Sequence, residues 1–310
     1  MILTVTLNTA LDLTYAVPAL VPHTSHRVGE VTERPGGKGV NVARVLSALG
    51  HDTVITGFAG GTNGAVLREL LAALPHRPTD ALVTVAGNTR RTLAVVDGSS
   101  GDTTQLNEPG PHIGPEEWAS LLRTYGELLT GAEAVALCGS LPPGIHVGAY
   151  AELIRLARSA GVPVLLDTAG EPLRRGIAAR PDVVKPNADE LARLTGAREP
   201  LRATRDARRR GARSVVASLG PEGLLAVTPD GVWRAAPPSA VRGNPTGAGD
   251  SAVAGLLSAL ADGLDWPDRL ARAVALSTAT VMATAAGEFD RADYEDLLAR
   301  VTVEPHAPAA

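Results

Sequence analysis

The chain has 310 residues, 45% hydrophobic and 20% charged, with a formal net charge of −4. This balance is typical of a globular protein, and we expect residues 1–310 to form one domain. The acidic charge and the 3% aromatic content argue against a nucleic-acid partner and against binding to an anionic membrane surface.

The cysteine count and the hydropathy pattern bear on location. One cysteine, Cys138, rules out a disulfide within the chain and suits a reducing compartment. The opening MILTVTLNTALDL lacks the basic start of a signal peptide and is typical of a strand. No apolar run approaches the roughly 20 residues that span a bilayer. We therefore expect a cytoplasmic protein with no membrane partner.

Apolar runs alternate with helical patterns along the chain. The runs are continuous rather than alternating, which is typical of strands buried on both faces. The expected strands are Ile2–Leu7, Thr53–Gly57, Ala134–Cys138, Val162–Asp167, Asp182–Lys185 and Ser214–Ser218. The expected helices are Val40–Leu49, Ala65–Leu74, Pro115–Leu129, Val147–Ser159, Thr204–Arg210, Ala248–Leu260, Pro267–Thr284 and Arg291–Val301. This order predicts an α/β fold with a central, mostly parallel sheet and helices on both faces.

Two segments depart from this alternation. Residues 12–35 are polar-leaning with no helical pattern, and residues 88–107 contain two alternating runs joined by GSSG, which is typical of a hairpin. We expect the two segments to form a small antiparallel sheet that serves as a lid. The last residues, EPHAPAA, are typical of a frayed tail.

The segment GNPTGAGDSA places small residues directly before an apolar helix. The backbone N–H groups of Gly247, Ala248 and Gly249 would point outward at the helix start, where they can bind an anion. Asp250, in the first helical turn, can either cap the helix or accept a proton from an attacking hydroxyl. The two glycines favour a group that approaches the backbone closely. GAGDSA also fits a dinucleotide-binding pattern, but the strand that should precede it is missing.

The segment RPGGKGVN forms a second glycine-rich helix start. Gly37 frees the backbone, and Lys38 with the helix N-terminus would make a positive concavity suited to a phosphate; a flexible loop with a solvated lysine is the alternative. Asn41 can bind a sugar hydroxyl or support the helix start.

Charged residues near the first strand and the lid can complete such a site. Asp12, after the first strand, is either a turn carboxylate or a ligand-binding group. Arg90 and Arg91 alternate along an expected strand, so only one of them can face the site. A guanidinium there could hold a phosphate in bidentate fashion.

The segment KPNADEL joins an expected strand to a helix. Asn187 and Glu190 have the spacing of a capping box, and the same residues could lie near magnesium, which keeps several waters and uses few protein carboxylates. Lys185 would then lie near ATP phosphates.

Further candidates follow other strands. Ser218, Gly220 and Gly223 lie where an open α/β sheet binds ligands. Ser140, in GSLPPG, lacks the G-x-S-x-G context of a nucleophile. The arginines between residues 202 and 213 are interpreted as a solvated helix face.

Taken together, these motifs resemble the ribokinase-like (pfkB) carbohydrate kinases, in their 1-phosphofructokinase and tagatose-6-phosphate kinase branch. The resemblance runs nearly end to end through TLNTALD, GGKGVNVARVL, TQLNEPGP, GSLPPG, KPNADEL, SLGPEG and GAGDS, in the family's order. The chain departs from this branch at Thr9, where TLNPALD is common, and at Asn244-Pro245-Thr246, before the glycine-rich turn.

The resemblance implies a role for each matching position. Asp250 would be the general base, and Gly247, Ala248 and Gly249 the anion hole. The acceptor would be bound by Asp12, Gly37, Lys38, Asn41, Arg90 and Ser140. The nucleotide would meet Lys185, Asn187, Ser218, Gly220 and Gly223, and Glu190 would organise Mg²⁺. The lid would also pair two copies of the chain as a homodimer.

The resemblance therefore predicts an ATP- and Mg²⁺-dependent kinase for a ketohexose monophosphate. We expect fructose 1-phosphate to be converted to fructose 1,6-bisphosphate. Tagatose 6-phosphate and fructose 6-phosphate are alternative acceptors, and a noncatalytic phosphosugar-binding regulator is an alternative function.

Overall fold

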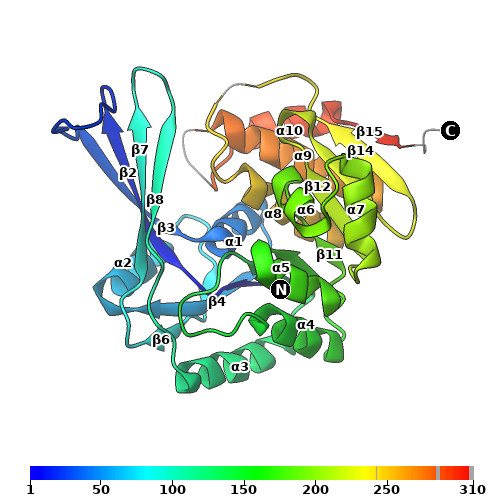
Figure 1. The fold of residues 1–310 in the computed structure, drawn as a ribbon, viewed down its shortest axis with the longest axis horizontal. Helices are drawn as coiled ribbons and strands as arrows, with labels where there is room; N and C mark the ends of the chain where they lie inside the picture. Colours follow the sequence, from blue (N-terminus) through cyan, green and yellow to red (C-terminus); the bar gives the residue numbers. More distant parts are fainter. Residues whose placement is uncertain (242, 284–286, 307–310) are drawn as a thin grey trace.

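The computed structural model describes residues 1–241, 243–283 and 287–306. It contains a large sheet of eleven strands covered by helices and a separate sheet of four strands that projects from this body (Figure 1). Within the described residues, no helix combines the length and apolar character needed to cross a membrane.

The main sheet is mostly parallel, as predicted. Its strands lie in the order β15 (Thr302–Pro305), β14 (Val232–Ala236), β13 (Leu224–Val227), β12 (Ser214–Ser218), β11 (Val183–Val184), β10 (Val164–Asp167), β9 (Ala134–Cys138), β1 (Ile2–Thr6), β4 (Thr53–Gly60) and β5 (Thr79–Asp80), with β6 (Val83–Val85) also on β4. All pairings from β12 to β5 are parallel, and β13, β14 and β15 add an antiparallel edge.

The antiparallel edge corrects one prediction. Thr302–Pro305 pairs with β14, so Glu304 and Pro305 form part of a strand and not of a frayed tail. A backbone ladder satisfies N–H and C=O groups whatever the side chains, so a short polar strand leaves little pattern in the sequence. The rest of the predicted tail, residues 307–310, lies outside the described residues.

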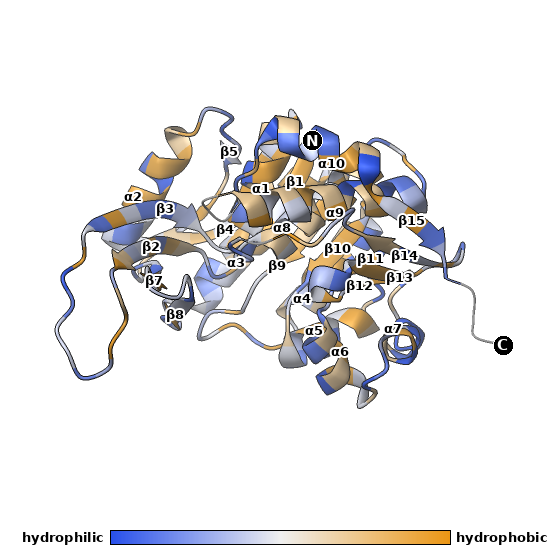
Figure 2. Cartoon of the chain, turned by 90° about the horizontal axis from the view of Figure 1, so that it is seen from above, coloured by the Kyte–Doolittle hydropathy of each residue, from blue (hydrophilic) through white to orange (hydrophobic). Residues whose placement is uncertain are grey.

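Helices cover both faces of the main sheet. One face carries α1 (Lys38–Leu49), α8 (Ala248–Ala261), α9 (Trp266–Met282) and α10 (Arg291–Arg300), and the other carries α3 (Pro115–Leu129), α4 (Ala149–Ser159), α5 (Gly170–Ala178), α6 (Ala188–Thr195) and α7 (Pro200–Arg209). Alternate residues of each strand enter the two cores. In β9, Ala136 and Cys138 pack beneath α8, whereas Val135 and Leu137 pack on the opposite side. The central strands and α8 are accordingly the most apolar elements (Figure 2).

Several helix limits differ from the predicted ones. The helix α2 (Gly61–Ala72) begins before the expected Ala65, and α4 begins at Ala149 instead of Val147. The helix α7 begins at Pro200 because the Glu199 side chain accepts hydrogen bonds from the Leu201 and Arg202 amides. The helix α5 was not predicted. The expected helix end at Thr284 falls outside the described residues.

The small sheet has the strand order β3 (Glu30–Gly36), β2 (Ala10–Val17), β7 (Arg90–Asp97) and β8 (Thr103–Asn107). The β7–β8 hairpin is confirmed. The expectation of a wholly antiparallel sheet is wrong, because β2 and β7 pair in parallel, from Ala10 beside Arg90 to Val17 beside Asp97. Both strands leave the main sheet after strands that run parallel to each other, β1 and β6, and they therefore enter the small sheet in the same direction.

Candidate active site

Two adjoining pockets lie at the carboxyl ends of the main-sheet strands, between the body and the small sheet. The first pocket is lined by Asn8, Asp12, Gly37, Asn41, Arg90 and Ser140, among others. The second pocket is lined by Lys185, Asn187, Ser218 and Gly249, among others. Six residues line both pockets, namely Lys38, Gln105, Glu190, Thr246, Gly247 and Asp250. The two pockets therefore form one cleft that meets at Asp250.

Asp250 is a buried carboxylate in the first turn of α8. Gly247 caps this helix in the left-handed conformation, with φ of 82°, which only glycine adopts at little cost. Asn41 Nδ2 donates a hydrogen bond of 2.9 Å to Asp250 Oδ2. Burial raises the pKa of Asp250 from its ordinary 3.8 to about 6, and the nearby charge of Lys38 opposes this rise. The group therefore exchanges a proton close to neutral pH.

The helix start beside Asp250 is where the sequence predicts an anion site. Gly249 lies against Lys185, since a Cβ added at Gly249 would come within 3.6 Å of Lys185 Nζ. The Ala248 amide already donates to the Pro245 carbonyl at 3.2 Å, so it would have to release this bond to meet an anion. The helix N-terminus and the adjacent ammonium group contribute positive charge here, while Asp167, 3.6 Å from Lys185 Nζ, contributes negative charge.

The cleft also contains a carboxylate that the sequence analysis missed. Asp167, at the carboxyl end of β10, is 2% exposed and lies 3.1 Å from Lys38 Nζ and 3.6 Å from Lys185 Nζ. Burial alone would raise the pKa of Asp167, but the charges of Lys185 and Lys38 outweigh burial and hold this pKa below its usual range. The charge of Asp167 in turn raises the pKa of Lys38. An aspartate that ends a buried parallel strand was the available signal.

The first pocket contains the arginine whose identity the sequence left open. Arg90 Nε donates to the Asn8 carbonyl at 3.3 Å, and Arg90 lines the pocket. Arg91 points away and pairs with Glu108 on the surface. Asp12 lies beside Thr92 across the β2–β7 ladder, and burial raises its pKa to about 6 against the opposing charge of Arg90.

Asn8 and Ser140 are joined at the floor of the first pocket. Asn8 Nδ2 donates to Ser140 Oγ and to the Pro109 carbonyl, each at 3.1 Å. Asn8 Oδ1 is buried, and no group in the described part of the chain donates a hydrogen bond to it. A buried acceptor without a donor costs free energy, and this oxygen packs against Gly110, where an added Cβ would come within 2.2 Å of it.

Asn187 and Glu190 form a reciprocal capping box at the start of α6. The Glu190 amide donates to Asn187 Oδ1 at 2.8 Å, and the Asn187 amide donates to Glu190 Oε2 at 2.9 Å. Both residues also line the second pocket, so the capping role and exposure to the cleft coexist. Among the described residues, no group of three or more His, Cys, Asp or Glu side chains has the arrangement of a metal site.

Two of the candidate residues lie in a turn that needs glycine and do not line the cleft. Gly220 and Gly223 flank a turn between β12 and β13, with φ of 61° and 86°, and neither lines the two pockets. A Cβ at Gly223 would come within 2.1 Å of the Ala235 carbonyl oxygen. The turn therefore explains both glycines without a ligand.

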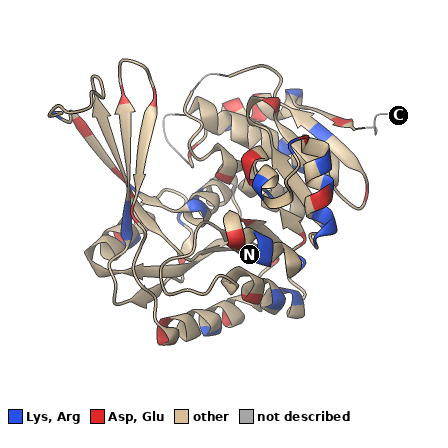
Figure 3. Cartoon of the chain, in the orientation of Figure 1, with Lys and Arg blue, Asp and Glu red and all other residues tan. Residues whose placement is uncertain are grey.

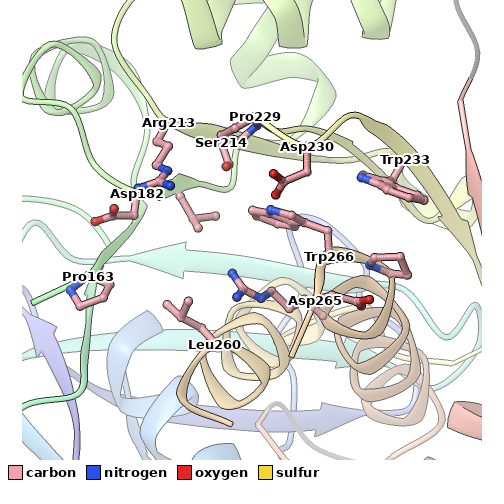
Figure 4. Close-up of a pocket in the computed structure, with 13 residues that line it drawn as sticks. Pro163, Asp182, Arg213, Ser214, Pro229, Asp230, Trp233, Leu260, Asp265 and Trp266 are labelled. Atoms are coloured by element: carbon pink, nitrogen blue, oxygen red, sulfur yellow. The ribbon is translucent and has the colours of Figure 1, made fainter. Parts of the chain in front are cut away.

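The arginines of α7 lie on the surface of the body, away from the small sheet (Figure 3). Arg202, Arg209 and Arg210 are exposed, as expected of a solvated helix face. Another cavity lies at the amino edge of the main sheet, where it is lined by Asp182, Arg213, Ser214, Asp230 and Trp266 (Figure 4).

Comparisons with known proteins agree with this geometry. A family model described as pfkB family carbohydrate kinase matches residues 4–292. A curated 1-phosphofructokinase of Rhodobacter capsulatus is 41% identical over 282 residues, which cover 89% of each chain. The structure of Escherichia coli phosphofructokinase-2 in complex with fructose-6-phosphate has a TM-score of 0.88 at 30% identity, covering 96% of this chain and 98% of that chain. Arabidopsis thaliana ribokinase shares the fold, with a TM-score of 0.75 at 21% identity over 96% of this chain and 98% of that chain.

Proposed function

Because the chain belongs to the pfkB family of carbohydrate kinases and is an ATP-dependent sugar kinase, we propose that it phosphorylates a ketohexose monophosphate, with fructose 1-phosphate as the acceptor and fructose 1,6-bisphosphate as the product. The observation that carries the proposal is the position of Asp250. It is a buried carboxylate at the junction of two pockets, with a pKa of about 6 and the glycine-rich start of α8 beside it, which is suited to an anion.

In the proposed mechanism, Asp250 is the general base. An acceptor hydroxyl in the first pocket attacks the γ-phosphorus of ATP in line, the bond from that phosphorus to the β–γ bridging oxygen breaks, and Asp250 accepts the hydroxyl proton. Asn41 keeps the carboxylate oriented through its 2.9 Å hydrogen bond. The amides of Gly247 and Gly249, with Lys185 beside Gly249, stabilise the charge on the transferred group, and the Ala248 amide joins them once it releases the Pro245 carbonyl.

Cationic residues in the first pocket support a phosphorylated acceptor. Arg90 lines this pocket and Lys38 lies at its junction with the second one, so two positive groups face a ligand there. We assign Arg90 and Lys38 to the acceptor phosphate and Asp12, Gly37, Asn41 and Ser140 to the remaining groups of the acceptor. A phosphate would add an anionic partner to these two cations, of which Lys38 already pairs with Asp167 at 3.1 Å.

The sequence similarity favours fructose 1-phosphate among the acceptors. At 41% identity, the Rhodobacter capsulatus relative is named a 1-phosphofructokinase. Fructose 6-phosphate and tagatose 6-phosphate are the alternative acceptors. A noncatalytic phosphosugar-binding regulator is disfavoured because Asp250 and the helix start beside it are intact.

The second pocket is assigned to ATP, with Lys185, Asn187 and Ser218 beside the nucleotide. Asn187 and Glu190 line this pocket with amide and carboxylate oxygens of the kind that Mg²⁺ prefers, and few protein ligands are needed when waters complete its shell. Glu190, with Oε2 held by the capping box, is the proposed magnesium residue. When bound, the ion would neutralise charge on the phosphates.

We further propose that the small sheet acts as the lid of this single domain. Residues 12–35 and 88–107 contribute most of it, and Gln105 from β8 already lines both pockets. Val31 and Leu106 on the edge strands are 53% and 58% exposed, and we assign them to the contact surface of a homodimer. The proposed location of the enzyme is the cytoplasm.

An ADP-release assay tests the proposal. Purified protein is supplied with Mg-ATP and, separately, with fructose 1-phosphate, fructose 6-phosphate, tagatose 6-phosphate, fructose and ribose. We expect turnover with the phosphorylated ketohexoses and the highest kcat/KM with fructose 1-phosphate.

Each other outcome of this assay has a defined meaning. Turnover only with fructose or ribose would reject the assignment of Arg90 and Lys38 to an acceptor phosphate. A higher kcat/KM with fructose 6-phosphate or tagatose 6-phosphate would replace the acceptor. No turnover, combined with a rise in Tm on addition of a phosphosugar, would support the regulator instead.

A further inference from the structure

The loop before α10 supplies a carboxylate that bridges two arginines. Glu288 Oε1 lies 3.1 Å from Arg44 Nη2 and 3.3 Å from Arg34 Nε. Arg44 belongs to α1 and its side chain is 7% exposed, whereas Arg34 belongs to β3 and its side chain is 34% exposed. One oxygen atom therefore joins the small sheet, the body helix α1 and the C-terminal part of the chain.

This bridge lies one helical turn from Asn41, which donates a hydrogen bond to the proposed base. Asn41 and Arg44 are three residues apart on α1 and therefore share a face of the helix. Asn41 donates to Asp250, and Arg44 pairs with Glu288. Gly287 packs against both, since a Cβ at Gly287 would lie 3.3 Å from Asn41 Cβ and 3.3 Å from Arg44 Nη1. Residues 287 and 288 therefore contact the face of α1 that carries Asn41, the residue that orients Asp250.

The bridge also reaches the acceptor side of the cleft. Arg34 lies opposite Asp12 in the β2–β3 ladder, and Asp12 lines the first pocket. The positive charge of Arg44 acts on Asp12 as well, although burial and the charge of Arg90 affect the pKa of Asp12 more strongly. Arg34, opposite Asp12, and Arg44, on the same helix face as Asn41, are thus held in place by Glu288, which lines neither pocket.

From these contacts we propose that Glu288 is a positioning residue for the kinase reaction. Its carboxylate holds Arg34 and Arg44 together, which fixes the small sheet over the first pocket and fixes α1, and hence Asn41, against Asp250. We expect the effect to be larger on the acceptor side, because the ion pairs of Glu288 reach Arg34, which lies opposite Asp12, whereas the residues assigned to ATP lie on or beside β11, β12 and α6. The expected kinetic effect rests on the proposed function, whereas the effect of the bridge on the structure does not.

Glu288→Gln keeps the size of the side chain and removes its charge. With the best acceptor from the assay above, we expect kcat/KM for the acceptor to fall about tenfold, within the range for residues that couple separate regions. The KM for ATP is expected to change less than about twofold. Arg34→Gln should give a similar loss, and the double variant should lose no more than either single variant, because both remove the same bridge.

Glu295→Gln is the matched control. Glu295 lies on α10 in an exposed pair with Arg291 at 3.8 Å, and it should keep wild-type kinetics. Wild-type kinetics for Glu288→Gln, additive losses in the double variant, or an equal rise in the KM for ATP would each overturn the proposal. If Glu288→Gln does not fold, Arg34→Gln alone decides, because its side chain is partly exposed.

A second measurement separates this inference from the proposed function. Amide hydrogen exchange in β3 and α1 needs no substrate, and it should be faster in Glu288→Gln than in wild type by about threefold or more, with Glu295→Gln unchanged. Unchanged exchange would overturn the inference even if the enzyme turns over. Faster exchange in a protein that phosphorylates none of the sugars would reject the proposed function and keep the bridge.

Discussion

A cavity with charged walls lies at the amino edge of the main sheet, and another lies at its carboxyl edge. The charged side chains of the two cavities have different kinds of partners. At the amino edge, Asp182 accepts the Val164 amide at 2.9 Å and Asp265 accepts the Asp268 amide at 3.2 Å as the cap of α9. Arg269 donates to the Leu264 carbonyl at 2.6 Å and lies over the ring of Trp266. These side chains serve the local backbone and the packing of α9.

At the carboxyl edge, the charged side chains face one another across the cleft. Asp167 lies between two lysines, and Asp250 lies beside Lys38 with one hydrogen bond from Asn41. The result is two buried aspartates whose pKa values move in opposite directions, down for Asp167 and up for Asp250. Carboxylates that differ in this way are suited to different roles, a fixed charge in one case and a proton acceptor in the other. A cavity alone does not distinguish the two edges, but the partners of its charges do.

The largest expected effect comes from removing the proton acceptor. Asp250→Asn should lower kcat by about 10²–10⁴-fold, the contribution typical of a general base. The KM for the acceptor should change little, because the residues assigned to sugar and phosphate remain. The measurement is ADP release under saturating Mg-ATP and acceptor.

Asp182→Asn provides the control from the opposite edge. Its amide oxygen can still accept the Val164 N–H, so we expect a kcat within about twofold of wild type. If Asp250→Asn kept more than about a tenth of the wild-type rate, well short of the general-base factor, Asp250 would not be the base.

A smaller loss of activity is expected when the charge of Asp167 is removed. Asp167→Asn leaves Lys185, whose side chain is 5% exposed, without its carboxylate partner. We expect the free energy of unfolding to fall by about 3 kcal/mol, as for other buried pairs that lose one member. Activity should fall by about tenfold, less than for Asp250→Asn, because Asp167 acts through the lysines. Urea denaturation and the ADP assay measure the two effects, and equal stabilities of Asp167→Asn and Asp182→Asn would contradict the first.

The same contrast shows what the sequence could predict. The main-sheet strands β1, β4, β9, β10, β11 and β12 and most helices follow from continuous apolar runs and 3.6-residue periodicity, because burial on both faces leaves a strong pattern. The short strands β5 and β6 were not predicted, because two or three residues leave too little pattern. The parallel pairing of β2 with β7 could not be predicted in this way. It depends on the direction in which two distant strands leave the main sheet, and hairpin signals report only on neighbours in sequence.

For the site, motifs identified the residues at helix starts and missed those defined by tertiary contacts. Lys38, Asn41 and Asp250 follow glycine-rich turns and do line the cleft. Asp167 has no such context, and only the fold brings it between Lys38 and Lys185. Gly220 and Gly223 lie in a turn that needs left-handed backbone, which has the same sequence signature as a ligand-binding loop, so their contact with the nucleotide stays a prediction.

The smallest expected effect is on stability, and its sign depends on pH. The folded protein holds the pKa of Asp250 at about 6, above its ordinary 3.8, so ionising Asp250 costs the folded state free energy. This cost is absent below pH 3.8, grows as the pH rises from 3.8 to about 6, and is complete above about pH 6. Without ligands, Asp250→Asn should therefore raise Tm by about 2–4 °C at pH 8 and leave it nearly unchanged at pH 4. Asp182→Asn should show no such pH-dependent gain. A lower Tm for Asp250→Asn at pH 8 would mean that the carboxylate stabilises the fold at the carboxyl edge, as Asp182 does at the amino edge, and would remove the contrast between the two.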